Sequence, residues 1–203
     1  EGGKAGGKEG GKEGGKEKKE KKEKKEKAAP AAAEEARAVD ISWADIKVGV
    51  ILEATNHPDS EKLYVETIDL GEEQPRQILS GLRNHMPIEA VKGARVVCIC
   101  NLQARKMGGI ESNGMVLCAS DADKTKLAFV VPPEGAKPGE RIAFEGYEGE
   151  PETPKKMAKK KAWEAAQPEL HTDAQGVACY KGVPFAVAGG VCTAKSVPSG
   201  GIS

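Results

Sequence analysis

The sequence lacks the features of a membrane-spanning or a disulfide-stabilised protein. No apolar run reaches the 18 residues expected of a membrane span, and no secretory signal peptide is evident. The five cysteines are odd in number and include no C-x-x-C pair, and Cys98, Cys100 and Cys118 fall inside apolar runs, as small core residues do. We therefore expect a protein of the reducing cytoplasm, without disulfides and not attached to a membrane.

The sequence also lacks the motifs of common catalytic and metal sites. It contains no G-x-x-x-x-G-K-[ST], G-x-S-x-G or H-E-x-x-H pattern. The three histidines, His57, His85 and His171, lie singly, so no zinc site is expected. We expect no catalysis within these 203 residues and predict no cofactor or metal.

Charge is divided unevenly along the chain. Residues 1–27 hold 11 Lys and 7 Glu, and the totals of 31 basic and 31 acidic residues leave 20 and 24 for the remainder. Residues 1–39 read as a low-complexity arm and linker rich in Gly, Lys and Glu, with a flexible tether followed by a fraying helix at 17–27. Because the body beyond the arm is mildly acidic, its attraction to a polyanion requires a local basic patch.

Residues 40–150 show the alternation of apolar and polar residues that is typical of short strands. The expected strands are 46–54, 63–70, 76–80, 94–102 and 115–119, with shorter candidates at 127–131 and 141–144. Gly49 inside the first strand indicates a bend or a close backbone approach. Together with a short helix expected at 86–91, this pattern favours a small closed barrel of the OB type.

Residues 151–203 have a different character. The segment 154–166 is predicted to be a helix with Pro154 near its start, and 177–188 a hairpin that turns at Lys181-Gly182. A piece of about 50 residues is too small to fold well alone, so we expect it to pack on the barrel. The predicted fold is therefore mostly β: an OB-fold barrel with a C-terminal helix-plus-hairpin extension, preceded by the lysine-rich arm.

The loop at 101–115 is the most informative segment for function. It follows a long apolar strand and places Arg105 and Lys106 among polar and glycine residues. In OB folds such loops line the nucleic-acid face, where basic side chains bind phosphates and polar ones bind bases or sugar hydroxyls. The alternative interpretation, a solvated hairpin loop, is not excluded by the sequence.

Several motifs occur in the order in which one family carries them. They are His57-Pro58-Asp59, Leu63-Tyr64-Val65, Ser80-Gly81-Leu82, N-L-x3-K-M-x-G-x2-S-x2-M at 101–115, Trp163-Glu164 and the segments 167–172 and 180–185. Over residues 40–203 the sequence resembles the tRNA-binding domain of endothelial monocyte-activating polypeptide II. That domain also occurs in auxiliary factors of multi-synthetase complexes and at the C-termini of some methionyl- and tyrosyl-tRNA synthetases.

The resemblance implies an OB fold that binds tRNA, and it implies the contact residues by motif. These are Ser80, Asn84, Asn101, Arg105, Lys106, Met107, Ser112 and Met115. The sequence departs from the family at Gly108, where many members have a basic residue, and at Ala104, where many have proline. The long form of the domain, with its C-terminal extension, implies a monomer.

A lysine cluster on the predicted C-terminal helix extends this list. It comprises Lys155, Lys156, Lys159 and Lys160, with Lys161 next to them. A solvated helix face is the usual interpretation of such a run, and beside an RNA-binding barrel we favour a patch that contacts phosphates. Aromatic residues make up only 4% of the chain, and most fall at core positions, which disfavours sequence-specific binding of single strands by base stacking.

Three hypotheses for function follow. The first is a non-catalytic tRNA-binding module that aids aminoacyl-tRNA synthetases in cis or in trans, through largely sequence-independent recognition of the tRNA backbone and shape. The second is a protein-interaction scaffold or cytokine-like fragment with incidental RNA binding; the counterpart of the family's cytokine heptapeptide, 47–53, keeps only its hydrophobic pattern and Gly49. The third is the tail of a synthetase whose catalytic domain lies outside these residues. The sequence does not distinguish a free-standing factor from such a tail.

Overall fold

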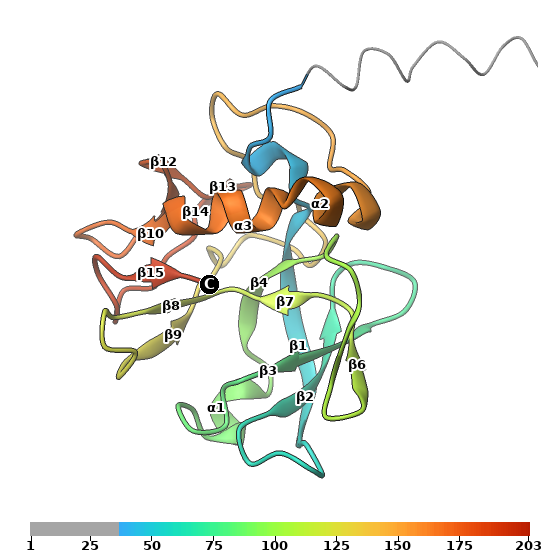
Figure 1. The fold of residues 1–203 in the computed structure, drawn as a ribbon. Coiled ribbons are helices and arrows are strands. Elements are labelled where there is room, and N and C mark those ends of the chain that lie inside the picture. Colours follow the sequence, from blue (N-terminus) through green and yellow to red (C-terminus); the bar gives the residue numbers. More distant parts are fainter. Residues whose placement is uncertain (1–36) are drawn as a thin grey trace, which may run out of the picture. The chain divides into compact units, whose positions relative to one another are not determined.

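The computed structural model describes residues 37–203, and within it Val39–Ser203 form one compact unit. The expected tether and fraying helix of the arm lie at residues outside this described part, so both stay predictions. Strands dominate the compact unit, and its few helices are short (Figure 1).

Five antiparallel strands form the barrel. They are β1 (Ile46–Asn56), β2 (Tyr64–Asp69), β3 (Arg76–Ser80), β4 (Arg95–Ile99) and β7 (Met115–Val116), in the order β3-β2-β1-β4-β7. The long strand β1 pairs with both β2 and β4, so it is the central strand of the sheet. The predicted mostly-β barrel is confirmed.

Gly49 sits where β1 crosses closely over its neighbour. A Cβ built at this position would lie 2.9 Å from both Ile68 Cγ2 and Leu70 Cδ2, closer than real side chains approach. A register shift between Ile51 and Glu53 bends the same strand two residues further on. The expected close backbone approach at Gly49 is therefore confirmed.

The open edges of the barrel, β3 and β7, are joined through the segment between β6 and β7. The Asn113 N–H donates to the Gln77 carbonyl at 2.9 Å, and the Leu79 N–H donates to Ser112 Oγ at 2.9 Å. A hydroxyl thus replaces a backbone carbonyl at the seam. Closing the seam in this way satisfies the backbone groups that an exposed edge strand would leave unpaired.

Two elements project from the barrel. Helix α1 (Ile88–Val91) follows Pro87 and is shorter than the expected 86–91. The loop 101–115 contains a hairpin, with β5 (Arg105–Met107) paired to β6 (Ile110–Ser112). The hairpin turns at two glycines with positive φ, Gly108 and Gly109, a conformation that residues with a Cβ rarely adopt.

The C-terminal residues build a second sheet together with strands from the middle of the chain. Its order is β12-β11-β10-β15-β8-β9. The bounds are β8 Cys118–Ser120, β9 Leu127–Phe129, β10 Leu170–Thr172, β11 Ala178–Tyr180, β12 Val183–Pro184 and β15 Gly201–Ile202, and β13 (Ala186–Val187) pairs with β14 (Gly190–Val191). The expected strand 115–119 is therefore two strands, because the chain leaves the barrel at Leu117 and enters this second sheet.

Two further expectations need correction. The expected strand 141–144 forms only isolated bridges, Lys47 with Arg141 and Ala143 with Ala186. The expected helix 154–166 is two helices, α2 (Pro154–Lys160) and α3 (Ala162–Ala166), because Lys161 between them has a φ of +51°. The 3-10 turns η2 (Ile41–Trp43) and η3 (Gln167–Glu169) complete the elements.

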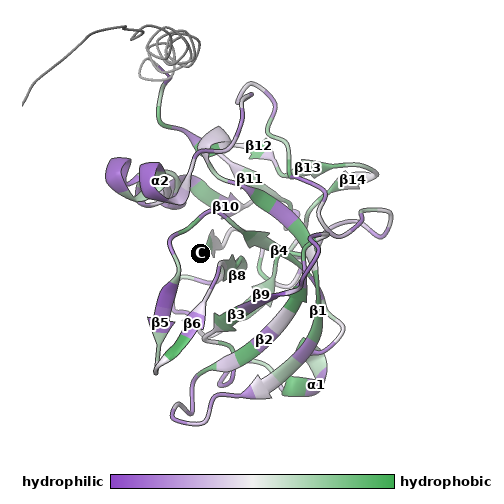
Figure 2. Cartoon of the chain, turned by 90° about the vertical axis from the view of Figure 1, so that its right-hand side faces the viewer, coloured by the Kyte–Doolittle hydropathy of each residue, from purple (hydrophilic) through white to green (hydrophobic). Residues whose placement is uncertain are grey.

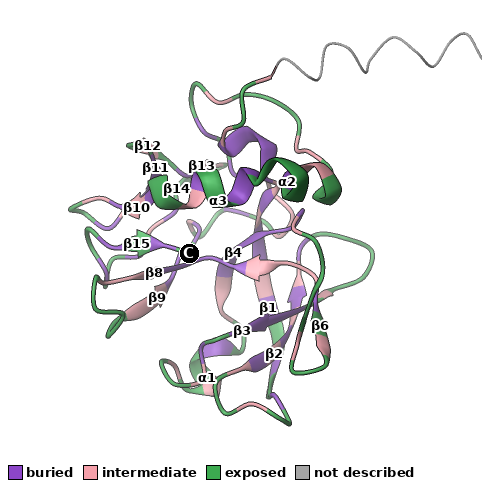
Figure 3. Cartoon of the chain, in the orientation of Figure 1, coloured by how far each residue is buried: buried purple, intermediate pink, exposed green. Residues whose placement is uncertain are grey.

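The strand β4 separates two hydrophobic clusters. Val96 and Cys98 face the barrel interior, whereas Val97 and Ile99 face a second cluster that includes Trp163 of α3 and other extension residues. Because successive side chains of a strand point to opposite faces, a strand buried on both faces has a continuous apolar sequence. The extension thus packs on the barrel, as expected, and Figure 3 shows the buried positions on both sides of β4.

The cysteines behave as core residues. All five are free and buried, and burial raises the pKa of Cys100, Cys118 and Cys192 to about 12. Thiols held in the protonated form are poor nucleophiles and poor metal ligands. In residues 37–203, no helix has the length and apolar character needed to cross a membrane.

Candidate nucleic-acid interface

A groove runs along one side of the barrel beside the segment 102–105. Its first part is a cavity of about 340 Å³ between β3, the β5–β6 hairpin and β7, here named the hairpin cavity. The residues of the predicted list that line it are Ser80, Arg105, Met107, Ser112 and Met115. Five predicted contact residues from three separate segments therefore meet in one place.

The groove continues from the hairpin cavity toward the helices. One depression of about 630 Å³ lies between the segment 102–105 and Met157 and Trp163 of α2 and α3, and another of about 680 Å³ reaches Arg76 and Lys155. The hairpin cavity and these two depressions share Leu102 and Gln103, so together they form one continuous surface, named here the rim groove. Figure 2 shows β5 and α2 on the same side of the chain, both largely hydrophilic.

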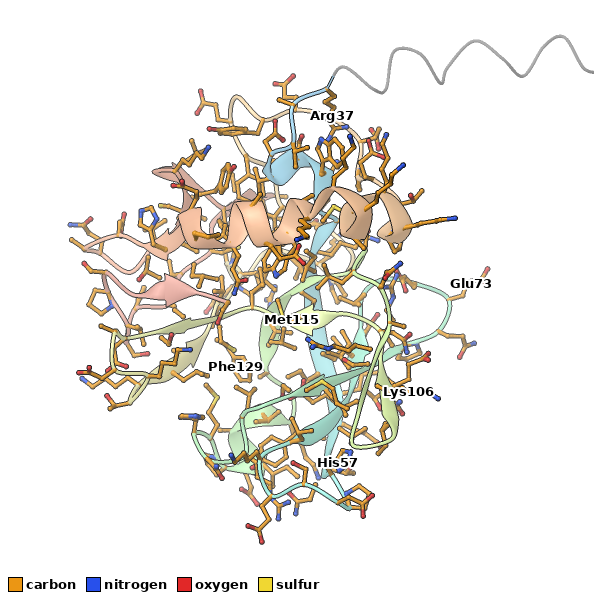
Figure 4. The ribbon with its side chains drawn as sticks, in the orientation of Figure 1. Arg37, His57, Glu73, Lys106, Met115 and Phe129 are labelled. Atoms are coloured by element: carbon orange, nitrogen blue, oxygen red, sulfur yellow. The ribbon has the colours of Figure 1, made fainter. Side chains whose placement is uncertain are left out.

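Alternation along β5 separates its two basic residues. Arg105 and Met107 line the hairpin cavity, and Lys106 between them belongs to the opposite face of the hairpin. Figure 4 shows Lys106 at the outer side of the hairpin, whereas Met115 lies between the helices and the barrel strands. Arg105 is exposed, so its guanidinium can reach a ligand in the groove.

Asn101 supports the site through hydrogen bonds inside the protein. It is 7% exposed, and its side chain makes three hydrogen bonds of 2.8 Å. Oδ1 accepts from the Asp45 N–H, while Nδ2 donates to the carbonyls of Trp43 and Glu152. These bonds tie the segments before β1 and before α2 to the end of β4. The amide is therefore engaged within the protein.

Ser112 is engaged in the same way. It is 4% exposed, and its hydroxyl accepts from Leu79 at the barrel seam and donates to the Gly114 carbonyl at 3.1 Å. Ser112 reaches the wall of the hairpin cavity with its hydroxyl hydrogen and one of its two oxygen lone pairs already engaged. It shapes the cavity through the seam.

Ser80 lines the cavity and is hydrogen-bonded to a buried carboxyl group. Its hydroxyl donates to Glu66 Oε1, and Glu66 is fully buried inside the barrel with no partner on Oε2. Burial raises the pKa of Glu66 to about 7, although the Ser80 hydrogen bond opposes this rise. The sequence analysis missed Glu66, and its signal was a charged residue at an inward position of a period-2 strand.

His57 holds the hairpin against the rest of the barrel. The imidazole is 2% exposed; its Nδ1 accepts from the Asp59 N–H at 3.0 Å, which leaves Nε2 to donate to the Met107 carbonyl at 3.0 Å. Gly108 packs on the ring so closely that a Cβ there would collide with it. This contact and the positive φ of Gly108 both disfavour any side chain at this position of the chain.

Replacing His57 with Ala is expected to loosen the hairpin while the barrel stays folded. The variant removes the bond to Met107 and leaves a cavity under Gly108, at a cost of about 1–3 kcal/mol. Amide hydrogen exchange at residues 105–112 should accelerate about 5- to 100-fold. The exposed His85→Ala change is the control, and unaltered exchange in the hairpin of His57→Ala would show that other contacts hold it.

The predicted lysines of the extension differ in how available they are. Thr153 caps α2 and Pro154 occupies its first turn, which presents Lys155 to the rim groove. Lys156 forms an ion pair with Glu152 at 2.8 Å and lies 5.3 Å from the ring centre of Trp43. Lys159 and Lys160 are exposed in the last helical turn. The structure therefore leaves Lys155, Lys159 and Lys160 exposed and engages Lys156 in an ion pair within the protein.

Several predicted contact residues do not line the groove, namely Asn84, Asn101, Lys106, Lys156, Lys159 and Lys160. Asn84 is exposed in the loop that follows β3, and it is absent from the walls of the groove. Within residues 37–203 there is no group of three or more His, Cys, Asp or Glu side chains arranged to hold a metal ion. The groove thus offers basic, hydroxyl and thioether side chains, which suit phosphates and bases.

Comparison with known proteins supplies the family. The model of the family described as putative tRNA binding domain matches residues 46–141. Aminoacyl tRNA synthase complex-interacting multifunctional protein 1 of Mus musculus is 46% identical over 85% of this chain and 55% of its own length. The probable methionine–tRNA ligase of Oryza sativa subsp. japonica is 49% identical over 81% of this chain, but over only 20% of the ligase. The chain spans about half the length of the first relative and a fifth of the second.

One solved structure matches this chain over its own full length. The C-terminal domain of Plasmodium vivax p43 superimposes with a TM-score of 0.76 at 34% sequence identity, over 82% of this chain and 100% of that domain. A match over 82% of the chain is longer than residues 1–150, so it includes part of the extension, which the family model over residues 46–141 does not reach. The chain therefore belongs to the family of tRNA-binding domains that includes the domain of endothelial monocyte-activating polypeptide II and recurs in aminoacyl-tRNA synthetases and their auxiliary factors.

Proposed function

We propose that this chain is a non-catalytic tRNA-binding module that recognises tRNA by backbone and shape through the rim groove. The observation that carries the proposal is the meeting of Ser80, Arg105, Met107 and Met115 with Lys155 along one continuous groove. The body outside the lysine-rich arm is net acidic, so attraction to a polyanion must be local. Arg105 and the exposed lysines of α2 supply that local charge.

The residues of the groove divide into contacts and supports. Arg105, Lys155, Lys159 and Lys160 are exposed and bind phosphates, while Ser80, Met107 and Met115 line the hairpin cavity. Asn101 and Ser112 position the backbone of the groove through their internal hydrogen bonds. Lys106, Lys156 and Asn84 contact the RNA only where it extends beyond the groove.

The module acts in cis or in trans to aminoacyl-tRNA synthetases, the proteins that carry the same domain among its relatives. Tethering a weak tRNA binder to a catalytic unit raises the local tRNA concentration without any new contact at the active site. Two relatives are described as cytoplasmic, and free buried thiols suit that reducing compartment. A monomer is supported by the second sheet, in which the extension pairs with β8 of the same chain.

The salt dependence of tRNA binding tests the groove directly. In the full chain, changing Arg105, Lys155, Lys159 and Lys160 together to Gln should make the slope of log K against log salt shallower by about 3, since each phosphate contact contributes roughly 0.7–0.9. Fluorescence anisotropy with two unrelated tRNAs should give the same change for both, because backbone contacts do not read sequence.

The matched control removes equal charge elsewhere. Lys92, Lys124, Lys137 and Lys195 are exposed and lie outside both the groove and helix α2, so their joint change to Gln should leave the slope nearly unaltered. Equal losses in both variants would show that net charge, rather than the groove, holds the RNA. Binding of one tRNA species alone, with a flat response to salt, would contradict the proposed mode of recognition.

A further inference from the structure

We propose that the hairpin cavity binds one unstacked RNA base and that Ser80 accepts a hydrogen bond from an N–H group on the edge of that base. The inference rests on the proposed function and names the chemical group that enters this part of the groove. It assigns to the cavity a role that backbone recognition alone does not require.

The walls of the cavity suit a flat, uncharged ring. Eight of the fifteen residues that line it are apolar, namely Leu79, Leu82, Leu102, Met107, Met115, Val116, Cys118 and Leu127. Its volume of about 340 Å³ falls at the small end of the range for ligand pockets, which suits a single base better than a larger group. A phosphate would lose its hydration against such walls, whereas thioether sulfurs pack favourably on aromatic rings. Two methionines here take the place of the aromatic platform that the sequence lacks.

The hydrogen-bonding groups of the cavity set which edge of the base can bind. Ser80 donates its hydroxyl hydrogen to Glu66, which leaves its oxygen lone pairs for the cavity. The hydroxyl of Ser112 is already bonded on both sides, to Leu79 and Gly114. The oxygen of Ser80 therefore offers the cavity an acceptor for an N–H group of the ligand, beside the polar side chains of Gln103 and Ser203 that also line the cavity.

This requirement is compatible with binding that does not read sequence. Adenine and cytosine carry exocyclic amino groups, guanine carries both an amino and an imino N–H, and uracil carries an imino N–H. Each of the four bases can thus meet Ser80 with a donor. Arg105 is exposed at the same cavity and can hold the phosphate of the nucleotide whose base is inserted.

A glycine in the cavity wall provides a clean way to block it. Gly81 lines the cavity, its φ lies outside the left-handed region, and a Cβ added there meets no atom within 4 Å. The first side-chain carbon of a Gly81→Leu variant therefore has room, and we expect the rest of the leucine to occupy part of the cavity. Gly135 is also free of contacts within 4 Å, has no positive φ and lies outside the cavity, so Gly135→Leu is the matched control.

The experiment compares base-bearing and abasic RNA of equal charge. Fluorescence anisotropy at one fixed salt concentration measures the affinity of the full chain for an octamer of adenylate and for an abasic octamer. We expect the wild type and Gly135→Leu to prefer the base-bearing octamer about tenfold, within the range measured for one bound base. In Gly81→Leu this preference should fall to about twofold or less, and Ser80→Ala should reduce it to an intermediate ratio.

The outcomes separate this inference from the function on which it rests. Full retention of the preference in Gly81→Leu, with an unchanged unfolding midpoint, would overturn the base site. If Gly81→Leu is unfolded, an unaltered preference in Ser80→Ala overturns it instead. Over a series of salt concentrations, the fourfold Arg105, Lys155, Lys159 and Lys160 variant should show a shallower salt dependence than the wild type for both octamers. An unchanged slope would count against the groove while leaving the ratio in the wild type as a separate result.

Discussion

Replacing Glu66 with Gln is expected to remove a loss of stability of about 2.5 kcal/mol that the wild type undergoes between pH 5 and pH 8. Burial raises the pKa of Glu66 from 4.5 to about 7 in the folded protein. The folded state therefore binds the proton more tightly than the unfolded state. The stabilisation that comes from this bound proton is fully present below the pKa of Glu66 in the unfolded chain. It is lost as the pH rises through the pKa of Glu66 in the folded chain, since an ionised carboxylate is then held inside the barrel.

The surroundings of Glu66 make this titration largely its own. Ser80 on β3 donates a hydrogen bond to it, and the thiols of Cys98 on β4 and Cys118 on β8 are the titratable groups close enough to interact. Burial keeps both thiols protonated across this pH range, so they add no charge. A buried carboxyl without a cationic partner must accept a proton or remain costly.

Urea unfolding at pH 5, 6, 7 and 8 measures the effect. The difference in the free energy of unfolding between Glu66→Gln and the wild type should rise in favour of the variant with increasing pH. Exposed Glu61→Gln is the control and should show no such trend. A constant difference across the series would mean that Glu66 keeps an ordinary pKa in the folded chain.

Replacing Asn101 with Ala is expected to destabilise the domain by about 3 kcal/mol or more, while Asn84→Ala stays within about 0.5 kcal/mol. Asn101 is buried and joins Asp45, Trp43 and Glu152 through three bonds, so its loss leaves one backbone N–H and two carbonyls in two segments without this partner. Asn84 is exposed and serves as the matched control. Thermal and urea unfolding of both variants provide the measurement.

A second substitution at the same position separates its two functions as acceptor and donor. Asn101→Asp keeps an oxygen for the Asp45 N–H but sets a carboxylate against the carbonyls of Trp43 and Glu152, so it should be at least as damaging as Ala. If both variants fold with wild-type stability and lose only tRNA binding, Asn101 contacts RNA directly and the positioning role assigned to it is wrong.

Local patterns account for much of what was foreseeable in this fold. The alternation in β1 and β2, the apolar run of β4 and the turn residues between the strands are properties of short segments, and the barrel follows from them. The limits of local patterns appear where the chain changes partners. Leu117 lies between β7, which pairs in the barrel, and β8, which pairs in the second sheet. The residues on its two sides form one apolar run in the sequence, but distant segments decide which sheet each side joins.

The candidate site shows the same division. Motif order placed Ser80, Arg105, Met107 and Met115 together correctly, because loops at one rim of a barrel converge. The motifs did not reveal that the side chains of Asn101 and Ser112 form hydrogen bonds within the protein, or that Lys156 forms an ion pair with Glu152. Whether a polar side chain is available depends on partners that are 50 or more residues away for Asn101, and on the barrel seam for Ser112.

By itself, then, the sequence determined the strand-rich barrel, the family and the basic loop, since these depend on local residue types and their order. Only the tertiary structure decided which of the predicted residues are exposed and which are engaged inside the protein, because burial and pairing arise when distant segments meet. Glu66, His57 and the hairpin cavity belong to this second group. Their chemistry comes from desolvation and from neighbours that no local pattern of the chain records.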